Sequence, residues 1–230
     1  MAQSKSLKAA YEKIGAEKLY TIAEAVKLMK ECSTVKFDAS AEAHFNLGID
    51  PRHADQQIRT TFSLPHGTGK SARVVVFCED DKAADCKAAG AVEAGGKDLI
   101  DKVSKGWMEF DAAVATPGMM RELAKIARVL GPKGMMPSPK AGTVSPEPTK
   151  AVKELVAGRM ELRNEKNGII HTVFGKLSFD AKKLEENLEA LLHIVKDNKP
   201  AAVKGVYIKT FSVNSTMGAG IKVQAEPIEE

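Results

Sequence analysis

The order of strand and helix patterns changes twice along this chain of 230 residues. Up to residue 66 and again from residue 159, isolated helices and short alternating strands are typical of an antiparallel α+β arrangement. Between these flanks, strands and helices alternate at a spacing that predicts a parallel sheet. Each flank has only about 65 to 70 residues, which is marginal for an independent hydrophobic core. We therefore expect the flanks to combine into one domain, with the middle inserted as a second.

This interpretation predicts a discontinuous, antiparallel α+β domain of residues 1–66 and 159–230 and an inserted, parallel α/β domain of residues 67–158. The chain passes between the two domains at glycines, which readily adopt backbone angles that other residues rarely adopt. We expect a hinge at Gly67, Gly69 and Gly158.

Local patterns define the elements of the first flank. The segment Thr21-Ile-Ala-Glu24 has the spacing of a capping box and predicts a helix that runs to about Cys32. Strict apolar and polar alternation over residues 42–49 predicts a half-buried strand with one polar face. Antiparallel pairing with the extended pattern over 58–64 is the natural expectation.

The other flank and the middle show equally local signals. Asn167-Gly168, between two apolar runs, predicts a hairpin. An amphipathic helix is expected over 179–197 and a strand pair over 206–213 and 221–225. In the middle we expect strands over 72–78 and 110–115 and helices over 82–89, 97–105 and 119–130, with a last helix ending near Gly158.

Composition limits the choice of partner. The chain has 34 Lys+Arg against 30 Asp+Glu, a net charge of +4 with no basic tail, which permits a nucleic-acid partner without demanding one. Aromatic residues make up only 5%, and no strand carries a pattern for stacking unpaired bases. A folded RNA, recognised by its backbone, 2′-hydroxyls and groove shape, therefore suits the chain better than an unfolded strand.

The three cysteines have no paired spacing, which fits a reducing cytosol. The five histidines show no metal-ligand spacing, and we expect neither a metal nor a cofactor. The first 15 residues lack the apolar stretch of a signal peptide, and no apolar run approaches the roughly 20 residues that span a bilayer. A soluble, cytoplasmic protein without a membrane partner is expected.

Two motifs invite an enzymatic interpretation. Gly67-Thr68-Gly69-Lys70-Ser71 resembles a phosphate-binding loop, but the full motif needs a glycine where Leu64 stands and a helix where a strand pattern follows. Glu79-Asp80-Asp81 follows a strand, where active sites often lie, although such a cluster more often caps the next helix. No nucleophile and base are brought together by spacing, so we expect no enzyme.

Two other segments could approach a polyanion. The long loop over 130–144 contains glycines, prolines, Lys133 and Lys140, and it is either a functional loop or an ordered surface loop. The segment Ser215-Thr216-Met217-Gly218-Ala219-Gly220 is either a wide hairpin turn or a place where small residues allow close backbone contact with a ligand.

Several long motifs in register resemble the family of the large-subunit ribosomal protein numbered one. They cover nearly the whole chain, from about Leu19 to Ala225: KFDASAEAHFNLGIDPRHADQQIR, LPHGTGK, LGPKGMMPSPKAGTV, NGIIHTVFGKLSF, KPAAVKGVYIK and NSTMGAG. The family usually has proline where Ala219 stands. The resemblance implies that the middle domain is Rossmann-like and that the domain built from both chain ends binds RNA.

The resemblance also implies the contacts and partners. The main RNA contacts carried over are Lys36, Phe37, Ser40, Glu42, Ser215, Thr216, Met217 and Gly218, with weaker RNA or tRNA contacts at Lys133, Lys140, His171 and Lys176. The implied protein is a monomer when free. On the large ribosomal subunit it binds folded 23S ribosomal RNA, forms the mobile stalk near the tRNA exit site and aids release of deacylated tRNA. It also represses translation of its own operon by binding the mRNA.

Two rivals stay open at this point. One is a nucleotide-dependent enzyme that uses the parallel-sheet domain and Lys70. The other is a regulatory RNA-binding protein that is not bound to the ribosome.

Overall fold

The computed structural model describes residues 5–15 and 18–225. They fall into two compact units, which are described separately. Unit 1 comprises Met1–Arg59, Leu64–Gly69 and Leu162–Glu230, and unit 2 comprises Thr60–Ser63 and Lys70–Glu161. The described part is mixed α/β, with an antiparallel sheet in unit 1 and a parallel sheet in unit 2, which confirms the predicted fold class.

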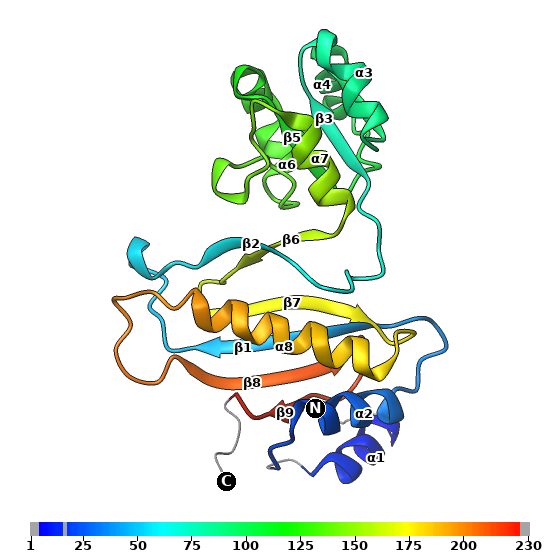
Figure 1. Ribbon diagram of the computed structural model, residues 1–230, viewed down its shortest axis with the longest axis vertical. Coiled ribbons are helices and arrows are strands. Elements are labelled where there is room, and N and C mark those ends of the chain that lie inside the picture. Colours follow the sequence, from blue (N-terminus) through cyan, green and yellow to red (C-terminus); the bar gives the residue numbers. More distant parts are fainter. Residues whose placement is uncertain (1–4, 16–17, 226–230) are drawn as a thin grey trace. The chain divides into compact units, whose positions relative to one another are not determined.

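Unit 1 is built on a four-stranded antiparallel sheet (Figure 1). Its strands are β1 (Ser40–Leu47), β7 (Ile169–Lys176), β8 (Ile208–Ser215) and β9 (Ile221–Val223), in the order β7-β1-β8-β9. The central strand β1 therefore pairs with two strands that come more than a hundred residues later in the chain.

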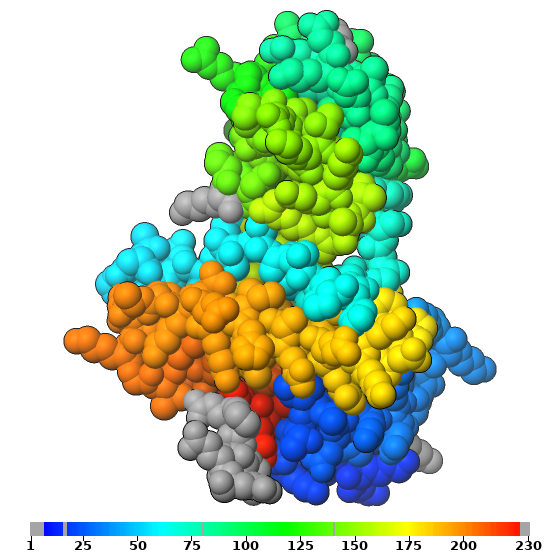
Figure 2. Space-filling model, in the orientation of Figure 1, coloured from blue at the N-terminus to red at the C-terminus, as the bar shows by residue number. Residues whose placement is uncertain are grey.

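The alternation within β1 decides which face of this sheet is covered. Ala41, Ala43, Phe45 and Leu47 are buried, and the residues between them are half-buried. The buried face packs against α2 (Ile22–Cys32) and α8 (Ala181–Asp197), and Figure 2 shows α8 in orange and yellow covering this side of the unit. The opposite face keeps the polar side chains.

Both helices follow their sequence signals. At the start of α2, Thr21 accepts from the backbone of Glu24 and the Glu24 carboxylate accepts from the backbone of Thr21, so the predicted capping box is confirmed. These bonds lower the pKa of the Glu24 carboxyl from its ordinary value. The described residues also include a helix that the sequence patterns did not indicate, α1 (Lys5–Ile14), whose last carbonyl accepts from the Tyr20 hydroxyl.

Unit 2 contains a three-stranded parallel sheet in the order β4-β3-β5. Alternate residues of β3 (Val74–Phe77) enter two separate cores, which explains why the whole strand is apolar and buried. One core includes α4 (Lys97–Ser104), and the other includes α3 (Asp80–Ala88) and α7 (Pro148–Val156). The remaining strands are β4 (Glu93–Gly95), which is too short to show a pattern, and β5 (Ala112–Ala115).

Two pairing predictions are wrong. The segment over 58–64 forms β2 (Arg59–Ser63), but β2 pairs with β6 (Arg159–Arg163) because β7 and β8 occupy both edges of β1. The hairpin at Asn167-Gly168 is reduced to a turn with a single antiparallel bridge between Asn164 and Ile170. β6, before this turn, and β7, after it, belong to different sheets.

Two smaller features of unit 2 also differ. The helix expected over 119–130 is divided into 3-10 turns and the short helices α5 (Met120–Leu123) and α6 (Ala127–Leu130), with non-helical angles at Ile126. Its buried positions nevertheless keep helical spacing. The N-cap of α3 is Glu79, without a side-chain cap bond, and not either aspartate.

The loop over 131–147 is ordered by its own hydrogen bonds. The Thr143 hydroxyl accepts from the backbone N–H of Ser138, at 2.8 Å, and the Thr143 carbonyl accepts from the backbone of Ala115. A short 3-10 turn, Pro139–Ala141, lies within the loop. These bonds are compatible with both alternatives, and a binding role for this loop stays a prediction.

Asp111, just before β5, is bonded to residues that precede β3. Its carboxylate accepts from Arg73 Nε and Lys70 Nζ, both at 3.0 Å. The Arg73 and Lys70 bonds hold the pKa of Asp111 well below its usual range. The same contacts occupy the lysine that a phosphate-binding loop would need.

We expect Asp111→Asn to lower the free energy of unfolding of unit 2 by about 1 kcal/mol at pH 7, because the cations are partly exposed and the pair is screened by water. A carboxyl with a lowered folded-state pKa stabilises above its unfolded pKa, near 3.9, and this stabilisation is lost as the pH falls further. Urea unfolding at pH 7 and pH 3 should show that the free energy of unfolding falls less between these pH values for Asp111→Asn than for the wild type. Asp101→Asn, at an exposed position, is the control, and an equal fall in all three proteins would contradict the assignment.

Candidate nucleic-acid interface

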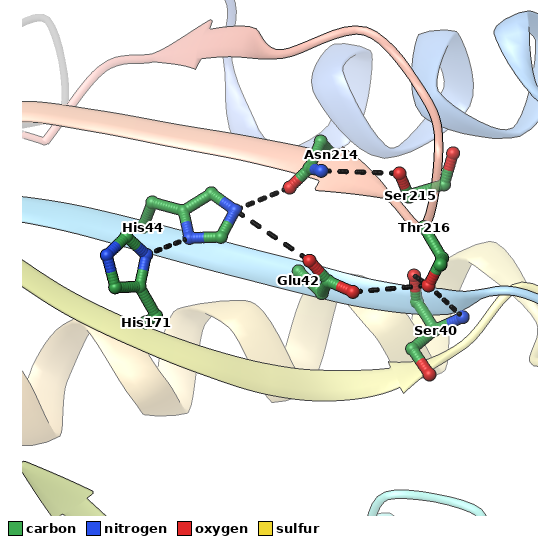
Figure 3. A network of polar contacts seen from close by, with 7 residues as sticks. All are labelled: Ser40, Glu42, His44, His171, Asn214, Ser215 and Thr216. Carbon is green, nitrogen blue, oxygen red and sulfur yellow. Dashed lines mark hydrogen bonds and ion pairs between the residues drawn. The ribbon is translucent and has the colours of Figure 1, made fainter.

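The polar face of the unit 1 sheet brings together residues from three distant segments. On β1 these are Ser40, Glu42 and His44, spaced two apart and therefore on one face. The register places Asn214 of β8 opposite Glu42, and His171 of β7 opposite His44. Figure 3 shows these side chains forming one polar network.

Thr216 links the end of β8 to the beginning of β1. Its backbone N–H donates to the Ser40 carbonyl at 3.0 Å, and its hydroxyl accepts from the Ser40 N–H at 3.1 Å. The same hydroxyl donates to the Glu42 carboxylate at 3.1 Å (Figure 3). Thr216 thus holds the turn of residues 215–218, of which it is part, in a defined position beside the strand that carries Glu42.

The turn itself presents one side chain to solvent. It closes with a hydrogen bond of 2.7 Å from the Gly218 N–H to the Ser215 carbonyl. Met217, in the middle, has a φ of 66° and is the one non-glycine residue with positive φ in the described part of the chain. Its side chain is 81% exposed. A large apolar group held outward in an unfavourable backbone conformation points to a binding contact.

Position 218 of this turn has no space for a side chain, so it requires glycine. A Cβ there would lie 2.3 Å from Ser215 Oγ and 3.0 Å from the Ser215 carbonyl oxygen. At Gly220, two residues later, a Cβ would meet no atom within 4 Å. The two glycines therefore form a matched pair, one inside the turn and one beyond it.

We expect Gly218→Ala to weaken RNA binding about tenfold, because the turn must open and displace Met217, whereas Gly220→Ala should bind like the wild type. The dissociation constants should be compared at one salt concentration, with a thermal unfolding curve to confirm that both variants fold. Equal affinities for the two variants would show that the turn conformation does not matter for binding.

The residues before β1 complete the predicted set. Lys36 and Phe37 lie in a bend and are exposed, and Phe37 keeps 57% of its surface accessible. Lys176 of β7 donates to Ser40 Oγ at 2.9 Å and to the Asp38 carbonyl at 3.3 Å, so it holds the entry to β1. Its ammonium group is engaged with the protein itself.

Two members of the network were not predicted from the sequence. His44 contacts Asn214 Oδ1 through Nε2 at 2.6 Å and His171 Nδ1 through Nδ1 at 2.7 Å. Asn214 Nδ2 donates to the Ser215 carbonyl at 3.2 Å. The strict alternation of β1 places His44 on the same face as Glu42, and this pattern could have identified His44 as a member of the network.

The other predicted residues lie elsewhere. Lys133 is exposed in unit 2, and the side chain of Lys140 is outside the described part of the structure. Gly67 and Gly69 have positive φ and belong to unit 1, and Gly158 has a φ of 98°. The hinge stays a prediction.

Within residues 5–15 and 18–225, no cluster of three or more His, Cys, Asp or Glu side chains is placed to hold a metal ion. Of the helices described, none has the length and apolar character needed to cross a bilayer.

Comparison with known proteins identifies the class. Residues 28–219 match the model of the ribosomal protein L1p/L10e family. The chain is 50% identical over 226 residues to large ribosomal subunit protein uL1 of Macrococcus caseolyticus (strain JCSC5402), which covers 98% of both chains. It is 50% identical over 220 residues to the protein of that name in Mycobacteroides abscessus, covering 96% of this chain and 94% of the relative.

The protein of the same name in Thermobifida fusca (strain YX) is 48% identical over 230 residues, which covers 100% of this chain and 98% of the relative. Matches of this extent place the chain among structural ribosomal proteins and not among enzymes. The chain belongs to the ribosomal protein L1p/L10e family, and the resemblance indicated by its sequence motifs is confirmed.

Proposed function

We propose that this chain is a structural constituent of the large ribosomal subunit that binds folded 23S ribosomal RNA, forms the mobile stalk near the tRNA exit site and aids release of deacylated tRNA. Relatives named for the large ribosomal subunit support the general role. The observation that carries the RNA site is the link from Glu42 through Thr216 to a turn that exposes Met217. The site of action is the cytoplasmic ribosome, and the protein is a monomer before it binds.

The chemistry of the site suits a folded RNA. The Glu42 carboxylate can accept from a 2′-hydroxyl or from a base amino group, neither of which a phosphate offers. The Met217 side chain and the exposed ring of Phe37 supply apolar contact area. Lys36 is exposed and can neutralise a phosphate. The shape of the site therefore contributes more to the affinity for RNA than its charge does, which agrees with the net charge of only +4.

Sedimentation with large ribosomal subunits tests this proposal. Large subunits stripped of their own member of the family should carry the full chain into the pellet at moderate salt. A Met217→Asp variant should remain in the supernatant. If the wild type binds the isolated ribosomal RNA but never sediments with subunits, the chain is instead a regulatory RNA-binding protein that acts off the ribosome.

The same surface supports a second role, repression of the chain's own operon. A turn held in place by Thr216 recognises the shape of a folded RNA. An mRNA that folds into the same shape therefore competes with the ribosomal RNA for the turn. An mRNA leader that mimics the ribosomal site should be displaced by the ribosomal RNA fragment in a competition assay.

A nucleotide-dependent enzyme has no support in unit 2. Lys70 donates to Asp111 at 3.0 Å, and the segment that follows leads into a strand and not into a helix. Equilibrium dialysis of the purified chain with ATP and GTP should show no binding.

A further inference from the structure

Two histidines on neighbouring strands of the candidate interface touch each other directly. The Nδ1 atoms of His44 on β1 and His171 on β7 lie 2.7 Å apart, and the ring centres lie 4.8 Å apart at an edge-on angle of 63°. Both rings are partly accessible, with 28% and 46% of their side-chain surface exposed. Figure 3 shows that the pair adjoins the Glu42–Thr216 link.

The surrounding hydrogen bonds assign the proton on each ring. The Asn214 amide is oriented by its Nδ2, which donates to the Ser215 carbonyl, so its Oδ1 faces His44 Nε2. An amide oxygen only accepts, and His44 Nε2 therefore carries a hydrogen. In a neutral His44 the Nδ1 atom must then accept, and His171 Nδ1 must donate to it.

This arrangement leaves one nitrogen ready for a proton. Neutral His171 carries no hydrogen on Nε2, and that atom lies 3.9 Å from a carboxylate oxygen of Glu165. A proton from solvent can bind there without breaking any hydrogen bond of the network. A second proton would place two N–H groups against each other across 2.7 Å, so the pair accepts one proton and resists another.

Two carboxylates lie near the pair. Glu42 on β1 lies 4.0 Å from His44 Nε2, and Glu165, which precedes β7, lies 3.9 Å from His171 Nε2. The facing residues of β8, Ser212 and Asn214, are neutral. The cations beside these residues are Lys176, which is bonded to Ser40, Lys222 of β9, which pairs with Ser212, and Lys18, which lines a pocket with Ser212 and Lys222.

We propose that the His44–His171 pair contacts a phosphate of the RNA bound at the turn, and that RNA binding takes up one proton at this pair. His171 carries the charge, and His44 is a positioning residue that connects it to the turn through Asn214. This inference rests on the proposed RNA-binding function and adds to it a dependence on pH. Imidazole is the side chain that can take up a proton near neutral pH, and this is why the pair is tested between pH 8.5 and pH 6.0.

The experiment measures affinity for a transcript of the large-subunit ribosomal RNA segment that forms the stalk, from pH 8.5 to pH 6.0 at fixed ionic strength. The wild type should bind more tightly as the pH falls, with a slope of up to tenfold per pH unit, the limit for one proton. His171→Gln should lose this slope, whatever its affinity at pH 8.5. Glu165→Gln should keep the slope.

The matched control is His193→Gln, an exposed histidine on α8, which should keep the wild-type profile. Nitrogen-15 spectra of the free protein at pH 8.5 should show His44 protonated on Nε2 and His171 on Nδ1. Binding that is independent of pH, an unchanged slope in His171→Gln, or the opposite tautomers would each overturn this inference and leave the proposed function intact. Absence of RNA binding at every pH would instead remove the proposed function.

Discussion

Replacing Met217 by aspartate is expected to lower the affinity for ribosomal RNA at least about 100-fold. Covering a methionine side chain contributes about 1.5 to 3 kcal/mol, and a carboxylate among phosphates adds repulsion to that loss. The upper end of that range alone reaches the roughly 2.8 kcal/mol that corresponds to a factor of 100, and the repulsion adds to it. Because Met217 is 81% exposed, the variant should fold normally.

The controls for this prediction separate shape from charge. Met217→Leu keeps an apolar side chain of similar size and should bind within a fewfold of the wild type. Lys133→Ala removes a positive charge from the loop of unit 2 and should cost less than Thr216→Ala, which removes the link to Glu42. A filter-binding assay at fixed salt gives all four values. A larger loss for Lys133→Ala would indicate a diffuse electrostatic mode of binding.

Replacing Asn187 by leucine is expected to lower the free energy of unfolding of unit 1 by about 2 to 4 kcal/mol. Asn187 lies fully buried on α8 and makes three hydrogen bonds. Its Oδ1 accepts from the His66 N–H at 3.1 Å, and its Nδ2 donates to the carbonyls of Gly67 at 3.0 Å and Phe174 at 2.8 Å. Leucine has a similar volume but leaves these backbone groups without that partner, and each unpaired buried group costs about 1 to 3 kcal/mol.

The same variant tests what holds the segment Leu64–Gly69 to unit 1. Hydrogen exchange at the His66 amide should accelerate in Asn187→Leu beyond the change expected from global stability. Asn198→Leu, at the exposed end of the same helix, is the matched control and should cost less than about 1 kcal/mol. Unchanged protection of the His66 amide would show that other contacts hold this segment.

Elements with local causes were predictable from the sequence. The capping box at Thr21, the alternation of β1 and the apolar stripe of α8 are each encoded within one stretch, and all three are confirmed. The wrong pairing of β2 and the reduced hairpin have a common reason. Which strand lies beside β1 depends on competition between segments more than a hundred residues apart, and no local pattern reports its outcome.

The contacts within the candidate site likewise could not be predicted from local sequence patterns. The sequence places Glu42 and His44 on one face, but their contacts with Thr216 and Asn214 depend on the register between β1 and β8. The RNA-contact residues came from the family resemblance and remain a proposal. The histidine pair needed the register of β1 on β7 as well, since it joins residues 127 positions apart.

The position of β1 in its sheet has a consequence for synthesis on the ribosome. Unit 2's long segment, Lys70–Glu161, is complete before either strand partner of β1 has been translated. Domains generally fold as units in the order in which they are made. The inserted unit can therefore fold first, while β1 waits for residues beyond 169 and the binding turn for residues beyond 215. If the proposed function holds, a nascent chain that has not yet reached residue 215 lacks the turn proposed to bind RNA, so RNA binding should begin only after β8 has been made.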